Sequence, residues 1–432
     1  MRCALSVLLF AAWLSAGAQT LPPSTPFPLP FPLPVRGGFV EAEAMQLLDI
    51  AVELEGWGIY QAPGLLPPPP PPDVGRYWTR RAEGYDPNAN DKSVSGGFGP
   101  FNSAWRLWQL SDQPVYAVTS RGTIPSWDSI EEDLLTNSLQ AEKIVVPTLD
   151  DKSIRFRLAA TRYRKLDEAH DFPVSEVHTG FSYGLSSVLF DRQYGLLKAL
   201  RDKVPPGATL LITGHSQGAA VATLLHSFLH YACADDGRRK AKEEDLGNYA
   251  DCEGFGLGEK HWLLKSYVFA QPKPGNWRYS LDLARIAANA GRFYTVNNYD
   301  DPVPQAPFAI QFLSDSFTKQ EINALSPRTR LLDWLVKVPN AIRRGFSGLI
   351  DDIELDEIMR RRGNLGNEFA NGDIKSARNS GSSLNFTPSG NIVGVRAGKV
   401  ADEEYEKYSP MDDFLREHHL FRYRQLSKEW QR

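Results

Sequence analysis

The chain has 432 residues, of which 42% are hydrophobic, so it can form one large domain or two ordinary ones with a substantial core. Its formal net charge is −4, from 48 Lys and Arg residues against 52 Asp and Glu residues. Such a chain lacks the positive field that attracts nucleic-acid phosphates. Composition and charge therefore argue against an intrinsically disordered protein and against a nucleic-acid partner.

The first residues predict a secretory signal peptide. Arg2 precedes an apolar run from Ala4 to Leu14, and Ala16-Gly17-Ala18 supplies the small residues of a cleavage site. An uncleaved membrane anchor is the weaker alternative, because a spanning helix needs roughly 20 apolar residues. We therefore expect residues 1–18 to be removed, the mature chain to be secreted or periplasmic, and no transmembrane segment to follow.

Cleavage of the signal peptide would also change the number of cysteines in the mature chain. It removes Cys3 and leaves Cys233 and Cys252, an even pair in a chain bound for an oxidising compartment. A disulfide between them would close a charged loop, and two free buried thiols are the alternative.

Residues 19–75 form a proline-rich segment that contains one predicted helix. The blocks that begin at Pro22 and at Pro67 favour extended polyproline II conformation, and we interpret them as spacers. A role as a ligand of SH3-like domains stays open. Between the two blocks, the apolar residues of 39–54 recur at helical spacing, which predicts a helix that docks on the main body.

From residue 76 to 432, short apolar runs alternate with longer mixed segments, as in α/β domains with a mostly parallel sheet and flanking helices. The pattern predicts strands over 115–120, 154–159, 209–213, 262–269 and 293–297. It predicts helices over 126–140, 180–203 and 217–233. Near-helical apolar spacing across Pro339 further predicts a helical insertion at about 310–370, before the C-terminus.

The stretch LLITGHSQGAAVATLL (210–225) places Ser216 at the junction of a predicted strand and a predicted helix. So short a junction forces the serine into a strained backbone conformation, and Gly214 and Gly218 remove side chains that would clash there. The turn exposes the hydroxyl beside the backbone N–H of Gln217 at a helix N-terminus, where a developing oxyanion is stabilised. A G-x-S-x-G match alone also fits a plain glycine turn, but the strand-to-helix switch favours a nucleophile.

A serine nucleophile needs a base that is oriented by an acid, and in sites of this kind the acid and then the histidine follow the serine in the chain. The predicted strand before Asp300-Asp301 ends in Pro-Val-Pro, which places one carboxylate at the sheet edge, although spacing does not separate the two. The histidines after Ser216 are His226, His230, His261, His418 and His419. The first two lie within the helix that follows the serine, and His261 has no motif around it.

Several blocks, in order, resemble the class 3 lipases, the fungal-type triacylglycerol lipase family of α/β-hydrolases. They are AVTSRGTIPSWDSIEEDLL (117–135), VHTGF (177–181), ITGHSQGAA (212–220), VFAQPKPGN (268–276) and VNNYDDPVPQAP (296–307). Gln217 stands where the family usually has Leu, and Ala270-Gln271 stand where it has Gly-Ser. These departures leave the substrate specificity open.

The resemblance implies an α/β-hydrolase fold and a secreted lipase or esterase that cleaves carboxyl esters, acylglycerols foremost, through a Ser-Asp-His triad and an acyl-enzyme. Ser216 is then the nucleophile and Asp301 the acid, while Thr123 matches the family's oxyanion residue and acts together with Gln217. His178 matches a family position that packs near the site, and we assign it a structural role.

The C-terminal histidine is chosen from MDDFLREHHLFRYRQLSKEW (411–430), expected to be helical from Phe414 onward. The family pattern places an apolar residue two positions after the histidine and a tyrosine five after it. Leu420 and Tyr423 fit when counted from His418, so His418 is our first choice and His419 the second.

The family also has a lid after the oxyanion residue, which corresponds to the apolar face of Trp127, Ile130, Leu134 and Leu135, so transient contact with a lipid interface is expected. A phospholipase or acyltransferase with the same triad and a non-catalytic secreted binding protein are the alternatives. No sequence motif calls for a metal or a cofactor.

Overall fold

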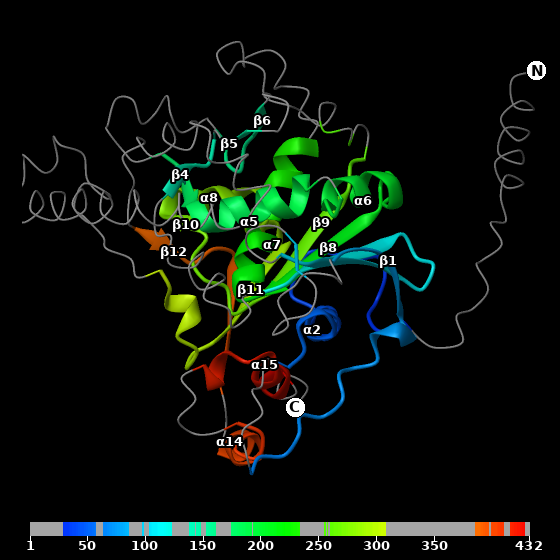
Figure 1. Ribbon diagram of the computed structural model, residues 1–432, viewed down its shortest axis with the longest axis vertical. Helices are drawn as coiled ribbons and strands as arrows, with labels where there is room; N and C mark the ends of the chain where they lie inside the picture. Colours follow the sequence, from blue (N-terminus) through cyan, green and yellow to red (C-terminus); the bar gives the residue numbers. More distant parts are fainter. Residues whose placement is uncertain are drawn as a thin grey trace, which may run out of the picture.

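A seven-stranded sheet, in the order β1-β2-β3-β8-β9-β11-β13, is the centre of the computed structural model (Figure 1). The structure describes residues 29–57, 64–85, 97–98, 103–122, 138–142, 144–147, 153–160, 174–191, 193–233, 255, 257, 260–307, 385–396, 399–409 and 415–427. The strands of the large sheet are β1 (Trp78–Gly84), β2 (Trp105–Leu110), β3 (Val115–Ser120), β8 (Thr209–His215), β9 (Leu263–Phe269), β11 (Phe293–Asn298) and β13 (Asn391–Val395).

The sheet is antiparallel from β1 to β3 and parallel from β3 to β13. Nucleophile turns of α/β-hydrolases lie at the carboxyl ends of such parallel strands, so this mostly parallel sheet gives the chain the predicted α/β-hydrolase architecture. Within the described residues, two small sheets accompany it. One joins β12 (Phe386–Thr387), β10 (Gly275–Asn276), β7 (Glu176–His178) and β4 (Ser138–Gln140), and the other pairs β5 (Ile144–Pro147) with β6 (Ser153–Phe156).

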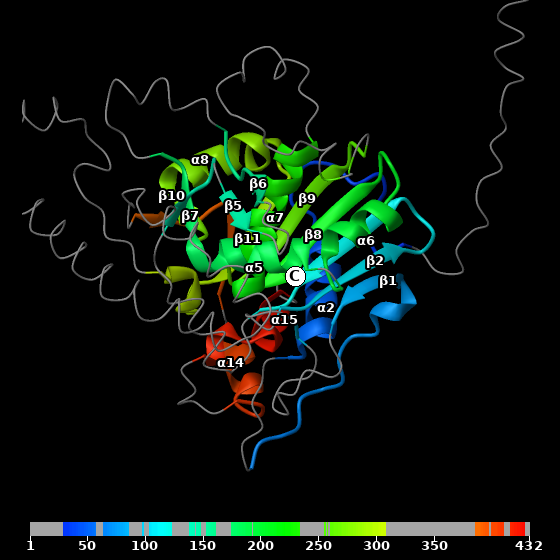
Figure 2. The ribbon, with the colours of Figure 1, turned by 45° about the horizontal axis from the view of Figure 1, so that its top comes forward.

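Helices cover both faces of the large sheet, as Figures 1 and 2 show from two directions. One apolar core lies between the sheet and α5 (Thr179–Phe190), α6 (Leu196–Lys203), α7 (Gln217–Cys233) and α8 (Trp277–Ile286). A second core lies on the other face, under α2 (Glu41–Glu55) and α15 (Leu420–Ser427). None of the helices in the described part of the chain combines the length and apolar character that a membrane crossing requires.

The remaining helical elements are short. They are α14 (Lys399–Tyr405) and the 3-10 turns η1 (Val74–Arg76), η3 (Ala288–Ala290), η4 (Val303–Gln305) and η7 (Arg416–His418).

The strands predicted over 115–120, 209–213, 262–269 and 293–297 agree with β3, β8, β9 and β11. The strand predicted over 154–159 overlaps β6 only up to Phe156, because residues 157–160 form a bend outside the pairing with β5. The helix predicted over 180–203 is two helices, because the Asp191 carboxylate accepts hydrogen bonds from the backbone N–H groups of Gln193 and Tyr194 and forms a turn between them. The end of the helix predicted over 126–140 is wrong, since residues 138–140 are β4, paired with β7. The predicted insertion at about 310–370 lies outside the described residues.

The helix predicted over 39–54 is α2, and a buried ion pair fixes it to β9. Lys265 Nζ lies 2.5 Å from Glu43 Oε2, and both side chains are 1% exposed. Tyr267 Oη donates to the same carboxylate oxygen at 2.8 Å, and Lys265 also donates to the Arg36 carbonyl at 2.8 Å. Burial, with the Glu43 carboxylate, raises the pKa of Tyr267, which keeps the phenol a donor. The helix from the proline-rich segment is therefore part of the folded body.

Removing the acid of this pair should destabilise the protein. We expect Glu43→Ala to lower the free energy of unfolding by about 3–5 kcal/mol, because it leaves the Lys265 ammonium buried without its counter-charge. The exposed Glu41→Ala on the same helix is the control and should change it by less than about 0.5 kcal/mol. Urea unfolding followed by circular dichroism measures both, and equal effects would contradict the assignment.

Candidate active site

Ser216 lies between the last residue of β8 and the first residue of α7, and its φ angle is 56°. Its backbone N–H donates to the Phe269 carbonyl at the end of β9 at 3.0 Å. A Cβ on Gly214 would lie 2.3 Å from the Gly218 carbonyl oxygen, and one on Gly218 would lie 2.3 Å from the Ser120 carbonyl oxygen. The strained, glycine-dependent turn predicted from the sequence is therefore present.

Three of the predicted site residues form one chain of hydrogen bonds. The Nε2 atom of His418 lies 2.8 Å from Ser216 Oγ, and its Nδ1 atom lies 2.8 Å from Asp301 Oδ2. An ionised carboxylate only accepts, so Nδ1 carries the hydrogen and Nε2 is left to accept the hydrogen bond of the serine hydroxyl. The imidazole is placed to take the serine proton.

Asp301 follows β11 and is held by three donors. Its Oδ1 atom accepts from the Val303 backbone N–H at 2.9 Å, and Oδ2 accepts from Tyr423 Oη at 2.8 Å as well as from His418. Tyr423 Oη in turn accepts from the Asn298 backbone N–H at 3.0 Å. Burial, together with the Asp301 charge, raises the pKa of Tyr423 well above its usual range, so its hydroxyl stays a donor.

The structure separates the two adjacent aspartates that spacing could not. Asp301 is 2% exposed, whereas Asp300 is exposed at the surface. Only Asp301 lies within hydrogen-bond distance of the imidazole.

The two adjacent histidines also face different ways. His418 ends η7, and His419 is extended, with φ −61° and ψ 141°, before α15 begins at Leu420. The continuous helix expected from Phe414 is therefore interrupted. The Nδ1 atom of His419 lies 2.7 Å from Tyr405 Oη, away from the serine. The break, rather than the helical rotation assumed from the sequence, directs the two rings apart.

Sequence reasoning missed a second layer of side chains behind the triad. His215 Nε2 lies 2.8 Å from the backbone carbonyl oxygen of His418, and His215 Nδ1 lies 3.2 Å from Glu55 Oε2. The other Glu55 oxygen, Oε1, accepts from the Gly122 backbone N–H at 2.8 Å. His215 was visible within the G-x-S-x-G motif, but nothing in the sequence linked it to a glutamate at the end of a distant helix.

Of the two predicted oxyanion residues, the structure describes Gln217 but not Thr123. Gln217 is the first residue of α7, so its backbone N–H lies at the helix N-terminus, next to Ser216. Thr123 lies outside the described residues, as do the predicted lid face and Cys252. Its neighbour Gly122 lies against the serine turn, because a Cβ there would be 2.6 Å from the His215 carbonyl oxygen and 3.2 Å from Ser216 Cβ.

The histidines without a predicted catalytic role have structural surroundings. His178 is fully buried, caps α5 by accepting the Phe181 N–H at 3.4 Å and stacks on that ring. His226 Nδ1 lies 2.7 Å from Ser266 Oγ. Burial lowers the pKa of both imidazoles to about 3, so both are neutral at physiological pH. Neither contributes to the chain of hydrogen bonds at Ser216.

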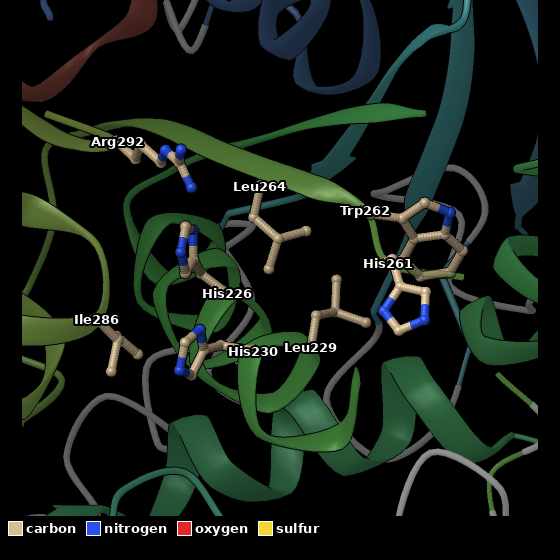
Figure 3. Close-up of a pocket in the computed structure, with 8 residues that line it drawn as sticks. All are labelled: His226, Leu229, His230, His261, Trp262, Leu264, Ile286 and Arg292. Atoms are coloured by element: carbon tan, nitrogen blue, oxygen red, sulfur yellow. The ribbon is translucent and has the colours of Figure 1, made fainter. Parts of the chain in front are cut away.

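A pocket lies at the amino ends of the parallel strands, whereas Ser216 lies at their carboxyl ends (Figure 3). His261 and Arg292, which line it, precede β9 and β11, whereas Ser216 and Asp301 follow β8 and β11. The other lining residues are His226, Leu229, His230, Trp262, Leu264 and Ile286. It is therefore separate from the triad. No cluster of His, Cys, Asp and Glu within the described ranges is arranged to hold a metal ion.

Comparison with known proteins finds one family that matches the central part of this chain. Residues 149–311 match the family model described as Lipase (class 3), which confirms the resemblance read from the sequence blocks. A search of curated proteins gave no match.

Solved lipase structures are similar at a distance. The M37 lipase is 16% identical, with 53% of this chain and 55% of that chain covered and a TM-score of 0.33. The lipase from Rhizopus microsporus var. chinensis is 16% identical, with 66% and 76% covered and a TM-score of 0.33. Lipase II from Rhizopus niveus is 14% identical, with 62% and 74% covered and a TM-score of 0.35. The lipase resemblance of this chain rests on the family match and on the mostly parallel sheet, and not on these distant similarities.

The two histidines can be distinguished by substitution. We expect His418→Ala to lower kcat for a soluble ester at least about 10³-fold, because the serine then has no base. His419→Ala should keep most of the activity, since its ring lies against Tyr405 and is not bonded to Ser216. Stopped assays with a chromogenic short-chain ester measure both, and the reverse order of losses would overturn the choice of His418.

The two aspartates form a second matched pair. Asp301→Asn should lower kcat by about 10³- to 10⁴-fold while the fold persists, because the amide no longer holds the Nδ1–H tautomer of His418. Asp300→Asn should leave kcat close to that of the wild type, because its side chain is exposed. Thermal unfolding of both variants checks that a loss of activity is not a loss of fold; a large loss in the Asp300 variant would count against the assignment.

Proposed function

We propose that this chain, of which residues 149–311 match the class 3 lipase family, is a secreted serine ester hydrolase that cleaves carboxyl esters, acylglycerols foremost. The observation that supports this most directly is the 2.8 Å contact from Ser216 Oγ to His418 Nε2, with Asp301 bound to the other ring nitrogen. A lone serine in a glycine turn would have no such base.

The reaction proceeds in two halves. Ser216 Oγ attacks the acyl carbonyl while His418 Nε2 takes its proton, and the same imidazole then gives that proton to the leaving alkoxide. In the second half His418 takes a proton from water, which attacks the acyl-enzyme, and the proton returns to Ser216. Asp301 stabilises the imidazolium that forms in each half, and Tyr423 holds Asp301 in place.

The tetrahedral oxyanion needs preorganised donors. The backbone N–H of Gln217 is one, because it lies at the N-terminus of a 17-residue helix. Thr123 is the second in our proposal, since Gly122 directly before it lies against the serine turn. Each such donor contributes about 3–4 kcal/mol to transition-state stabilisation in related chemistry.

The substrate class is proposed from the family match, and the location from the N-terminal sequence. A lipid ester presented at an interface is the substrate that the class 3 lipase match favours. Secretion is proposed from the signal-like residues 1–18.

The nucleophile can be tested on the mature chain. We expect Ser216→Ala to lower ester hydrolysis at least about 10³-fold without a change in the unfolding temperature, because only the attacking oxygen is removed. An alkyl phosphonate ester should label the wild type at Ser216 and leave the alanine variant unlabelled, as peptide mass spectrometry can show. Full activity in Ser216→Ala, or labelling of a different serine, would refute the proposal.

A panel of substrates then defines the class. Triacylglycerols and soluble esters graded by acyl length, phospholipids and an acceptor alcohol separate a lipase from an esterase, a phospholipase and an acyltransferase. Turnover of none of them by a folded chain would favour a non-catalytic binding protein.

A further inference from the structure

Glu55, the last residue of α2, reaches the back of the site from the N-terminal segment. Its side chain is 11% exposed and that of His215 is 7% exposed. One carboxylate oxygen accepts the Gly122 N–H at 2.8 Å, and the other lies 3.2 Å from His215 Nδ1. A single carboxylate thus contacts both the loop after β3 and the residue before the nucleophile.

The hydrogen bonds of His215 define where its protons lie. A backbone carbonyl only accepts, so Nε2 must donate to the His418 carbonyl, 2.8 Å away. A carboxylate also only accepts, and a proton must therefore lie between His215 Nδ1 and Glu55 Oε2. Glu55 therefore helps to hold the imidazole in the orientation in which Nε2 donates to the His418 carbonyl.

The His215 ring is also packed against the ring of the base. The two ring centroids lie 4.6 Å apart with their planes tilted by 31°. The centroid of the Tyr423 ring lies 5.9 Å from that of His215, with the planes at 73°. His215 therefore contacts both the backbone and the ring of His418.

We propose that Glu55 is a positioning residue for the triad: through His215 it fixes His418, and through Gly122 it fixes the loop that precedes Thr123. The inference rests on the proposed function, and it adds to it that the helix of the proline-rich segment supports catalysis. The Glu55 carboxylate acts through Gly122 and His215, to which it is bonded, and not on the reacting atoms.

The helix that carries Glu55 is held firmly enough for this role. Glu43 pairs with Lys265 near its start, and Asp49 Oδ1 lies 2.8 Å from Arg424 Nε on α15, the helix that carries Tyr423. Since α2 is fixed to both β9 and α15, the position of the Glu55 carboxylate relative to the triad is set by the fold.

Substitution by two side chains of similar length tests the proposal. Glu55→Met keeps the packing but loses both hydrogen bonds, and we expect kcat for a soluble ester to fall about 10- to 100-fold with KM changed by less than about twofold, because misplacement of the base affects the chemical step. Glu55→Gln should rescue the loss to within about threefold of the wild type. Its amide oxygen accepts the Gly122 N–H, and its NH2 group donates to Nδ1 of neutral His215.

The control is Glu53→Met on the same helix, whose carboxylate pairs with Arg106, and it should not change kcat. If Glu55→Met fails to fold, His215→Phe should show the loss in kcat, because it keeps a ring but loses the contact with Glu55 and the hydrogen bond to the His418 carbonyl. A folded Glu55→Met with the kcat of the control, or a Glu55→Gln as impaired as Glu55→Met, would overturn the inference. Ser216→Ala, assayed alongside, separates this from a failure of the proposed function, because that failure would leave the serine variant active.

Discussion

The left-handed backbone of Ser216 is the constraint on which the rest of the site depends. At φ 56° the residue can end β8 and begin α7 without an intervening loop, and this directs the hydroxyl out from the carboxyl edge of the sheet. The conformation is unfavourable by itself for a residue with a side chain. It persists because the Ser216 N–H is bonded to β9, and because Gly214 and Gly218 allow β8, α7 and the end of β3 to approach within contact distance.

The pairing of the parallel strands brings Asp301 to the same end of the sheet as Ser216. Gly214 pairs with Ser120 on one side and Val268 on the other, so the ends of β3, β8 and β9 lie side by side. Asp301 follows the next strand, β11, at the same edge. Only the base comes from outside the sheet: His418 is brought in by η7, and Tyr423 on α15 bonds to both Asp301 and the end of β11.

The N-terminal segment is closely integrated with this arrangement. A helix flanked by proline blocks could have been a tether, yet α2 covers one face of the sheet and its buried residues form a core together with β3, β8 and β9. The charged side chains on its inner face each meet a partner from another element: Glu43 meets Lys265, Asp49 meets Arg424 and Glu55 meets His215. Burying charges is unfavourable unless they are paired in good geometry, so these pairs specify where the helix docks.

The sequence by itself determined the local features. Short-range geometry dictates the turn at Ser216, because a strand, a glycine, a serine, a glycine and a helix within so few residues permit little else. Apolar runs likewise located β3, β8, β9 and β11, whose side chains are buried on both faces of the sheet. The edge strand β1, with mostly exposed side chains in WTRRAEG, has no such pattern and was missed.

Only the tertiary structure decided the pairings between distant residues. Asp300 and Asp301 are equivalent by spacing, and burial of one carboxylate beside His418 separates them. The rings of His418 and His419 point in different directions because the chain becomes extended between η7 and α15. This break cannot be predicted from helical periodicity in the sequence. Glu55 precedes His215 by 160 positions, and no local signal records such a contact. Its role depends on how α2 packs on the sheet, which is a property of the assembled core and not of either segment alone.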